Sequence, residues 1–411
     1  MKRIIPLLIL MASCTGNTQT KKEKSDSNRN PIIEFLHEKD TTNTGKLPVL
    51  DLQKKYPQRF ITLQDIADVE YIVLETHDDG LIAGSHSTTI TDSLIITMNS
   101  LTDNVIFFKR DGTFSHSFNR KGNSGTEYSS MGFNLCINPY TQEVYVYDFL
   151  RRRIQVYTYE GEYKRTLKIG GDGFSYGQIY YINSESLLAE DHMNVDYEPQ
   201  EPTNPKPYYK ISVNDGAKSR LPITIANRIR NGHNMYDEET NRTTGTSVRI
   251  LPVSTINEEL IISDFSLDTI YKYQNNSLVP IARKENWMKD NGIPYIVAPD
   301  AMTDDFFLWH AIEKDFKKPI LPTKTYLQNR HTRKCIQVKL VDKNIIDKYF
   351  DFSHRMTASD HILPKNSVLQ FYSAYRLKEL YESGKLTGEL KEIASKLNED
   401  DNPVLMLAKF K

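Results

Sequence analysis

The feature that most constrains this chain is a two-strand unit that recurs along it. In each copy an apolar strand ends in Asn or Asp, a short polar link follows, and a second alternating strand runs into a turn. Three copies are clear, and their first strands are Leu94–Asn99, Val144–Asp148 and Leu260–Asp264. A fourth, degraded copy begins at Leu187–Asp191 and resumes after an insertion at Tyr208–Val213. Each copy predicts a β-hairpin followed by the start of a third strand.

The spacing of these copies predicts the fold. Asn99 and Asp148 lie 49 positions apart, and Asp148 and Asp264 lie 116 positions apart, which is twice 58. A period of about 40 to 60 residues made only of short strands is typical of β-propeller blades, which bury their apolar faces against neighbours in a ring. We therefore predict an all-β fold, a six-bladed β-propeller with four-stranded antiparallel blades.

Two further blades complete the predicted ring. The fifth contains Phe306–Trp309 and Cys335–Val338, and the sixth contains Val368–Tyr372 and Val404–Ala408. Residues 68–75 form a strand with no blade of its own. We expect this strand to be the outer strand of the last blade, because that place closes the ring and removes an open sheet edge.

The last blade carries an insertion with a different period. Residues 374–397 space their leucines for one apolar side, as in a helix, and Gly384 and Gly388 divide the segment into two pieces. We therefore predict a short helical insertion in the last blade.

Four further features are shared with a known group of proteins: Leu74-Glu75, the segment from Arg120 to Tyr128, the hairpin at Asp148, and the ending Asp401–Leu405. Through them the chain resembles, over residues 50–411, the six-bladed β-propeller lipoproteins of Bacteroidota. Around Asp148 and Gly161 it also resembles the NHL class of propeller repeats. The resemblance implies the fold and leaves the activity open, because propellers host both binding proteins and enzymes.

The N-terminus predicts secretion and a lipid anchor. A short basic start precedes the apolar run Ile4–Met11, and small residues stand directly before Cys14. This pattern resembles a bacterial lipoprotein signal, in which the cysteine receives the lipid; the alternative is an ordinary secretory signal with an incidental cysteine. We predict a signal peptide over 1–13, a lipidated N-terminus and flexible tether over 14–48, and the propeller over 49–411.

Charge and its placement predict the compartment. After Cys14 no acidic residue occurs before Glu23, whereas surface-exposed lipoproteins of Bacteroidota resemble one another in carrying an acidic cluster there. We therefore expect an outer-membrane lipoprotein that faces the periplasm.

The 52 basic and 53 acidic residues balance, which argues against a nucleic-acid partner. The remaining cysteines, Cys136 and Cys335, are interpreted as buried small hydrophobic residues.

Several polar motifs invite a chemical interpretation. Asn99, Asp148 and Asp264 end equivalent strands and could form a ring of ligands, but a short polar residue at a strand end more often caps a turn. Arg151–Arg153 lies in a hairpin link, where we favour a solvated loop over a site for an anionic glycan or lipid head group.

The histidines do not define a metal site. His331 and Cys335 are four positions apart, but the cations between them would repel a metal ion. His192 ends an inner strand of a blade and is the one weak candidate ligand. We predict no catalytic residues and no cofactor.

Two functions remain open from the sequence. The favoured one is a non-enzymatic propeller that binds or scaffolds a protein, peptide or glycan; the alternative is a metal-dependent propeller enzyme of the lyase or lactonase type. Ligand contacts are expected from two long insertions, residues 193–207 and 228–249, because loops of this length are often functional. The second insertion is polar and shows no strand pattern.

Overall fold

The computed structural model describes most of the chain from Asn30 onward. The described residues are 30–40, 42, 45–83, 87–131, 135–148, 150–169, 176–191, 206–225, 228–229, 232–237, 242–248, 250–318, 320–346 and 362–411.

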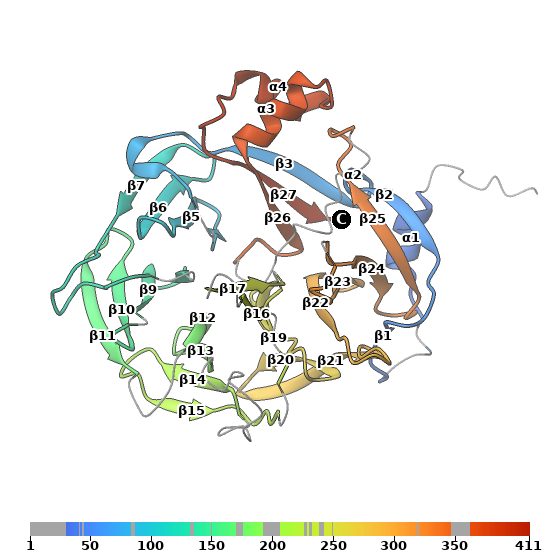
Figure 1. The fold of residues 1–411 in the computed structure, drawn as a ribbon, viewed down its shortest axis with the longest axis horizontal. Coiled ribbons are helices and arrows are strands. Elements are labelled where there is room, and N and C mark those ends of the chain that lie inside the picture. The colour runs from blue at the N-terminus through green and yellow to red at the C-terminus, as the bar shows by residue number, and fades with distance from the viewer. Residues whose placement is uncertain are drawn as a thin grey trace, which may run out of the picture.

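Six β-sheets stand around a ring, each as one blade (Figure 1). Blade one contains β4 (Thr89–Ile90), β5 (Leu94–Asn99), β6 (Asn104–Lys109) and β7 (Phe114–Phe118). Blade two contains β8 (Leu135–Asn138), β9 (Glu143–Asp148), β10 (Arg153–Thr158) and β11 (Tyr163–Lys168). Blade three contains β12 (Tyr176–Asn183), β13 (Ser186–Asp191), β14 (Tyr208–Ser212) and β15 (Lys218–Arg220). Blade four contains β18 (Val253–Ile256), β19 (Glu259–Ile262), β20 (Thr269–Gln274) and β21 (Ser277–Glu285). Blade five contains β22 (Tyr295–Met302), β23 (Phe306–Glu313), β24 (Thr323–Asn329) and β25 (Cys335–Val341). The sixth contains β26 (Ser367–Tyr372), β27 (Val404–Phe410) and β3 (Ala67–Val73). The predicted six-bladed propeller is confirmed.

An N-terminal arm runs along the outside of blades four, five and six. β1 (Val49–Asp51) pairs in parallel with β21, and β2 (Gln58–Thr62) pairs in parallel with β25, so blades four and five each gain a fifth strand. After α2 (Leu63–Ile66), β3 pairs antiparallel with β27 along its whole length, and the short helix η2 (Asp78–Gly80) leads into the first blade. The predicted ring-closing strand therefore lies where the sequence places it, whereas the two parallel strands were not predicted.

The arm begins with α1 (Pro31–His37), whose first turn is capped by Asn30: its Oδ1 accepts a hydrogen bond from the backbone N–H of Ile32 at 3.1 Å. Leu36 of this helix is buried in the core between blades five and six. The helix belongs to the segment 14–48 that was predicted as a tether, so within the described residues the folded part already includes Asn30.

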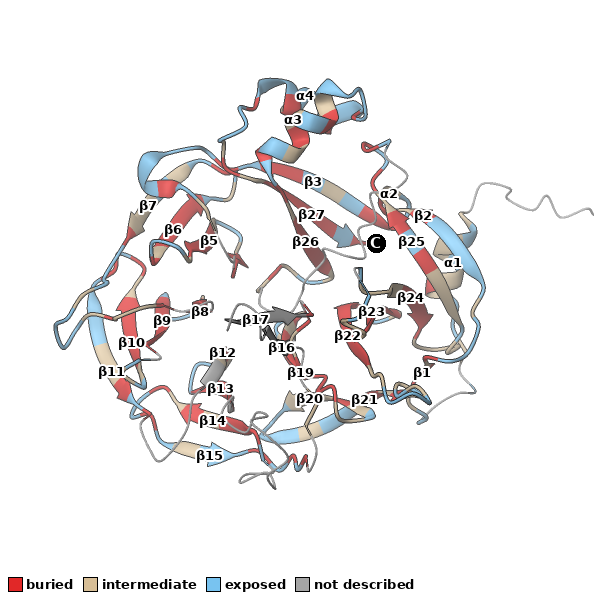
Figure 2. Ribbon diagram, in the orientation of Figure 1, coloured by how far each residue is buried: buried red, intermediate tan, exposed pale blue. Residues whose placement is uncertain are grey.

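Both faces of each blade are buried, which explains the apolar strand runs. Six hydrophobic clusters fill the six junctions between neighbouring blades. In β9, for example, Val144 and Val146 pack toward the first blade, and Tyr145 and Tyr147 pack toward the third. Burial is greatest in the inner strands and falls toward the outer ones (Figure 2). Side-chain alternation thus fastens each blade to two neighbours.

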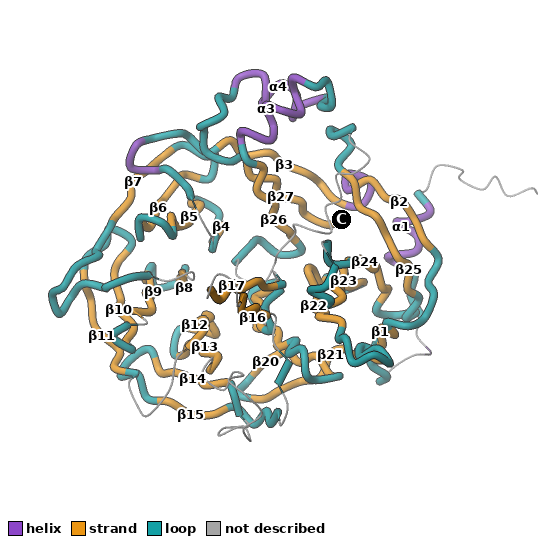
Figure 3. Tube along the Cα trace, in the orientation of Figure 1, coloured by secondary structure: helices purple, strands orange, loops and turns teal. Residues whose placement is uncertain are grey.

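The predicted helical insertion lies between β26 and β27, on the outside of the ring (Figure 3). It consists of α3 (Ala374–Glu382) and α4 (Gly388–Lys396). Gly384 and Gly388 have φ angles of +68° and +52°, a region that favours glycine, and so they separate the two helices as predicted.

One prediction about the second insertion is wrong. Residues 228–249 were interpreted as lacking strands, but they contain the hairpin β16 (Gly232–Asp237) and β17 (Arg242–Ser247). The sequence of this segment lacks the alternation of apolar and polar residues that marks a half-buried strand. Viewed down the ring, the hairpin lies over the middle (Figure 1).

Candidate functional site

The polar residues at the strand ends act separately. Asn99 Oδ1 accepts hydrogen bonds from the backbone N–H groups of Leu101 and Thr102 at 3.0 and 3.2 Å, so it caps its own turn as predicted. Asp148 is fully buried and accepts instead from Ser129 and from Arg153 Nε at 3.3 Å. It therefore fastens its hairpin to the preceding link, and it does not belong to a ring of ligands.

Asp264 both caps a turn and belongs to a buried charge network. Its Oδ1 accepts from the Ser266 N–H at 2.9 Å, and its Oδ2 accepts from the Tyr208 hydroxyl at 2.5 Å and from Arg228. Arg228 Nη2 also donates to Glu190 Oε1 at 2.7 Å. The arginine comes from the second insertion and ties blades three and four together, which is a structural role.

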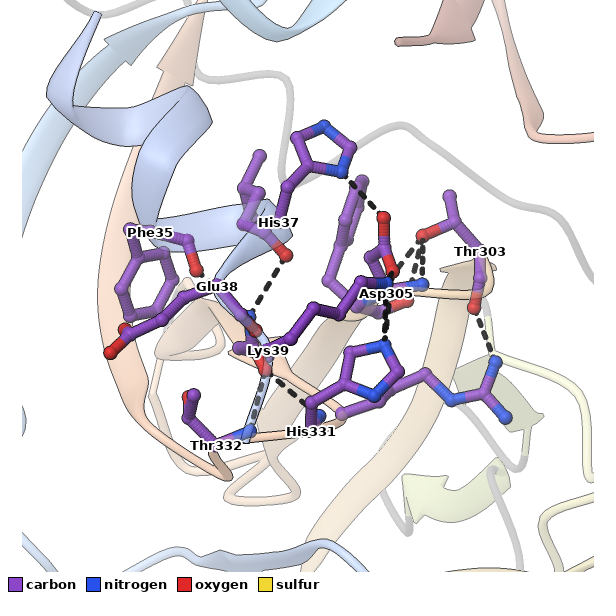
Figure 4. A network of polar contacts seen from close by, with 12 residues as sticks. Phe35, His37, Glu38, Lys39, Thr303, Asp305, His331 and Thr332 are labelled. Atoms are coloured by element: carbon purple, nitrogen blue, oxygen red, sulfur yellow. Dashed lines mark hydrogen bonds and ion pairs between the residues drawn. The ribbon is translucent and has the colours of Figure 1, made fainter. Parts of the chain in front are cut away.

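His331 belongs to the network that holds the N-terminal arm (Figure 4). Its Nε2 lies 3.0 Å from Asp305 Oδ1, and Asp305 also contacts Lys39 and, at 2.5 Å, His37 Nδ1. Burial would raise the pKa of Asp305, but these hydrogen bonds outweigh it and hold the pKa well below its usual range. Beside it, Asn329 Nδ2 donates to three carbonyl oxygens of the arm, those of Phe35, Leu36 and Glu38.

The metal candidates are not brought together. Cys335 packs against the core between blades four and five, and burial raises its pKa to about 12. Among the described residues, no three His, Cys, Asp or Glu side chains are arranged to hold a metal ion. His192 and Cys14 lie outside the described residues.

A groove on the rim between blades four and five is a candidate for binding. We call it the rim groove; its volume is about 820 Å³, within the range of small-molecule sites, roughly 300–1,000 Å³. Its walls come from the link between β1 and β2 and from the turn before β22, and its floor comes from blade five. The lining residues are Leu52, Gln53, Lys54, Lys55, Tyr56, Gln58, Lys289, Asp290, Asn291, Tyr295, Lys324 and Gln337.

Hydrogen bonds fix the walls of the rim groove. Asn286 Nδ2 donates to Asp51 Oδ1 at 2.9 Å, and Gln53 Nε2 donates to the Met288 carbonyl at 3.4 Å, which joins the two walls. The backbone N–H of Asp51 donates to the Tyr56 hydroxyl at 3.0 Å and orients that ring. The groove is therefore built by a long-range contact between the arm and blade four.

The rim groove is cationic and contains two tyrosines. The ammonium groups of Lys54 and Lys324 lie 5.5 and 5.3 Å from the ring centres of Tyr56 and Tyr295. Burial raises the pKa of Tyr56 to about 12, so its hydroxyl stays neutral at physiological pH. Of the four lysines in the lining, Lys289 is paired with Glu313 at 3.0 Å; the other three face one aspartate, which leaves a positive site with neutral hydrogen-bonding groups.

None of these lining residues was singled out from the sequence. They come from four separate segments: two are polar links, and the other two contribute one strand residue each, Lys324 and Gln337. Within the described residues, every helix is too short or too polar to cross a bilayer.

Comparison with known proteins places the fold. Residues 47–298 match the model of a family described as "Domain of unknown function (DUF4934)". No curated protein sequence matches the chain. A presumed exported protein from Bacteroides fragilis is similar in structure, with a TM-score of 0.62 and 11% identity over 89% of this chain and 100% of that one. A member of the DUF4221 family from Bacteroides vulgatus gives a TM-score of 0.49 and 10% identity over 84% and 98% of the two chains. At such identities the first likeness shows a shared fold alone.

Proposed function

Because this chain belongs to the DUF4934 family, whose description names no activity, we propose its function from the candidate site. We propose that the protein is a periplasm-facing outer-membrane lipoprotein and that its propeller binds an acidic glycan in the rim groove. The sequence left protein, peptide and glycan open as ligands. The observation that favours a glycan is the combination of tyrosine rings, side-chain amides and lysines in one open groove.

Each of these groups suits one part of an acidic sugar. Pyranose rings present apolar C–H faces, which pack on an aromatic ring such as that of Tyr56, which is only partly buried. Sugar hydroxyls pair with side-chain amides such as that of Gln337, which both donate and accept. Ammonium groups such as that of Lys55 attract carboxylates without demanding one fixed geometry. A polymer of uronic acids would satisfy all three along an open groove.

The location rests on the N-terminal sequence and is supported by the Bacteroides fragilis neighbour, which is described as a presumed exported protein. Lipidation of Cys14 would tether the propeller to the membrane through the residues before α1. In this arrangement the rim groove stays open to the periplasm.

The proposed ligand can be tested with polygalacturonate as the probe. We expect the mature chain to bind it, and the double substitution Lys55→Glu with Lys324→Glu to weaken binding by on the order of tenfold or more, because two attractive charges become repulsive. The control is Lys343→Glu with Lys391→Glu, which makes the same change in net charge on exposed residues elsewhere. Calorimetric titration measures both, and neutral amylose and polyglutamate serve as comparison ligands. Equal binding of polyglutamate would point to acidic peptides and contradict the glycan proposal.

The anchor can be tested by fractionation. Substituting Cys14→Ala is expected to move the protein from the membrane fraction to the soluble fraction, because a single thiol carries the lipid. Membrane pellets washed with high salt and probed by immunoblot give the answer. Retention of the variant in the washed pellet would contradict lipid anchoring.

A further inference from the structure

We propose that a second groove, on the outer edge of blade two, binds a phosphate group. Its volume is about 730 Å³, and no carboxylate lines it. The lining residues are Gly125, Arg151, Arg152, Arg153, Tyr163, Lys164, Arg165, Thr166 and Lys168. We call it the arginine groove. It lies on a different blade from the rim groove, so this inference does not depend on the glycan proposal.

The strand register places two of its cations together. Arg153 on β10 is paired with Lys168 on β11, so their side chains leave the same side of the sheet. The guanidinium of Arg153 is then fixed by its neighbours: it donates to Asp148 at 3.3 Å and to the carbonyl oxygens of Gly125 and Glu127 at 3.0 and 2.5 Å. These bonds leave some of its five N–H donors free for a ligand.

A neighbouring guanidinium is oriented in the same way. Arg151 donates to the carbonyl oxygens of Ser124 and Glu127 at 3.4 and 3.3 Å, and to Asn123 Oδ1 at 3.2 Å. Carbonyl and amide oxygens hold the side chain in position without cancelling its charge. The link between blades one and two therefore acts as a support for two arginines.

The groove keeps a surplus of positive charge. Six cations line it, and Glu143 pairs with two of them, Lys164 and Arg165, at 2.6 and 2.7 Å. Asp148 pairs with Arg153, and Glu127 lies near Arg151, so three carboxylates outside the lining offset three of the six positive charges. In the described part of the chain, Arg152 and Lys168 are exposed and have no ion pair. A phosphate dianion offsets more of this surplus than a single carboxylate does.

Phosphate fits these groups best. A phosphate monoester carries roughly −1.5 to −2 charges at neutral pH and offers three strong acceptor oxygens. Guanidinium groups match these oxygens in paired, charge-assisted hydrogen bonds. The hydroxyls of Tyr163 and Thr166 lie in the same lining, 2.9 Å apart; Thr166 donates to Gln155 and accepts from Tyr163, so these groups fix the wall beside the arginines. The phosphate can come from a lipid head group or from a soluble phosphate.

The test compares two phosphate sources on the soluble form of the chain, residues 15–411, which omits the lipidated cysteine. One arm titrates inorganic phosphate by calorimetry, and the other measures co-sedimentation with vesicles of phosphatidic acid in phosphatidylcholine, against phosphatidylcholine alone. We expect binding in at least one arm, and a loss of on the order of tenfold or more in the variant Arg152→Glu with Lys168→Glu. Both substituted residues are exposed, so the fold and polygalacturonate binding should be unchanged.

Each outcome has a definite meaning. Binding to phosphatidic acid vesicles alone assigns a lipid head group, and binding of inorganic phosphate assigns a soluble phosphate; either supports the proposal. Absence of binding in both arms overturns it. Equal binding by the groove variant and by Lys343→Glu with Lys391→Glu also overturns it, because the attraction would then follow net charge instead of the groove.

Discussion

Deleting β3, residues 67–73, is expected to leave the mature chain unable to form a closed ring. The seven residues of β3 pair with β27 from Val404 to Phe410, and their loss leaves blade six with an open edge. Ile72 of this strand and Leu74 just after it also fill the junction between blades six and one. Burial of each such side chain contributes about 1.5–3 kcal/mol, and whole domains are stable by only about 5–15 kcal/mol. Circular dichroism and thermal melting should show no cooperative transition.

A matched pair of substitutions distinguishes the loss of ring-closing contacts from an effect of shortening the chain. Ile72 is 3% exposed and Val73 is 40% exposed on the same strand. We expect Ile72→Asn to lower the free energy of unfolding by about 3 kcal/mol or more, and Val73→Asn to change it by less than about 1 kcal/mol. Deleting residues 16–29, the part of the predicted tether that precedes Asn30, should leave the melting temperature unchanged. Equal melting temperatures for the deletions of β3 and of the tether would contradict the ring-closing role.

The propeller ring could be predicted because each repeat can be recognised from a short contiguous stretch of sequence. Each hairpin carries its own alternation and turn, so the repeat survives even in the interrupted third blade. The closing strand could be placed by exclusion, since an apolar strand without a blade needs a partner. In contrast, β1 and β2 have three and five residues and add in parallel to strands more than 200 positions away. Nothing in such short segments specifies their partners.

The two grooves were hidden for a related reason. The rim groove joins Tyr56, Tyr295 and Gln337, which come from three segments that lie far apart in the sequence. The arginine triplet was visible, but its neighbours Thr166 and Lys168 become significant only through the register of β10 with β11. Turn-capping residues such as Asn99 were predictable because they act on amides two and three positions away. Contacts between residues that are close in sequence can therefore be predicted from the sequence, whereas sites assembled through strand register cannot.

Lys284 is expected to make stability depend on pH in a range where most other groups do not titrate. This side chain is 1% exposed; it donates to the carbonyl oxygens of Phe265 and Asp264 at 2.9 and 3.3 Å and lies 4.8 Å from the Trp287 ring centre. Burial lowers its pKa from 10.5 to about 7, and nearby Asp264 and Asp268 only partly oppose this. The folded chain thus favours the neutral amine, which needs no water shell.

The sign of the effect follows from proton counting. Between pH 7 and pH 10.5 the unfolded chain holds a proton on this amine that the folded chain has released. The free energy of unfolding therefore rises with pH across this window, by up to about 1.4 kcal/mol per pH unit, and below pH 7 the amine contributes no further change. From pH 7 to pH 9 we expect a gain of about 2 kcal/mol from this group.

Urea unfolding at several pH values measures this slope directly. Lys284→Met should remove the rise between pH 7 and pH 9, and Lys284→Gln, which keeps a hydrogen-bond donor for the two carbonyls, should remove it too. The slope is the readout because the absolute stability of Lys284→Met also includes the loss of those hydrogen bonds. Lys343→Met, on an exposed lysine, should keep the slope of the parent chain. If Lys284→Met kept it as well, the amine would be charged and hydrated in the folded protein, and water would have to reach the core beside blade four.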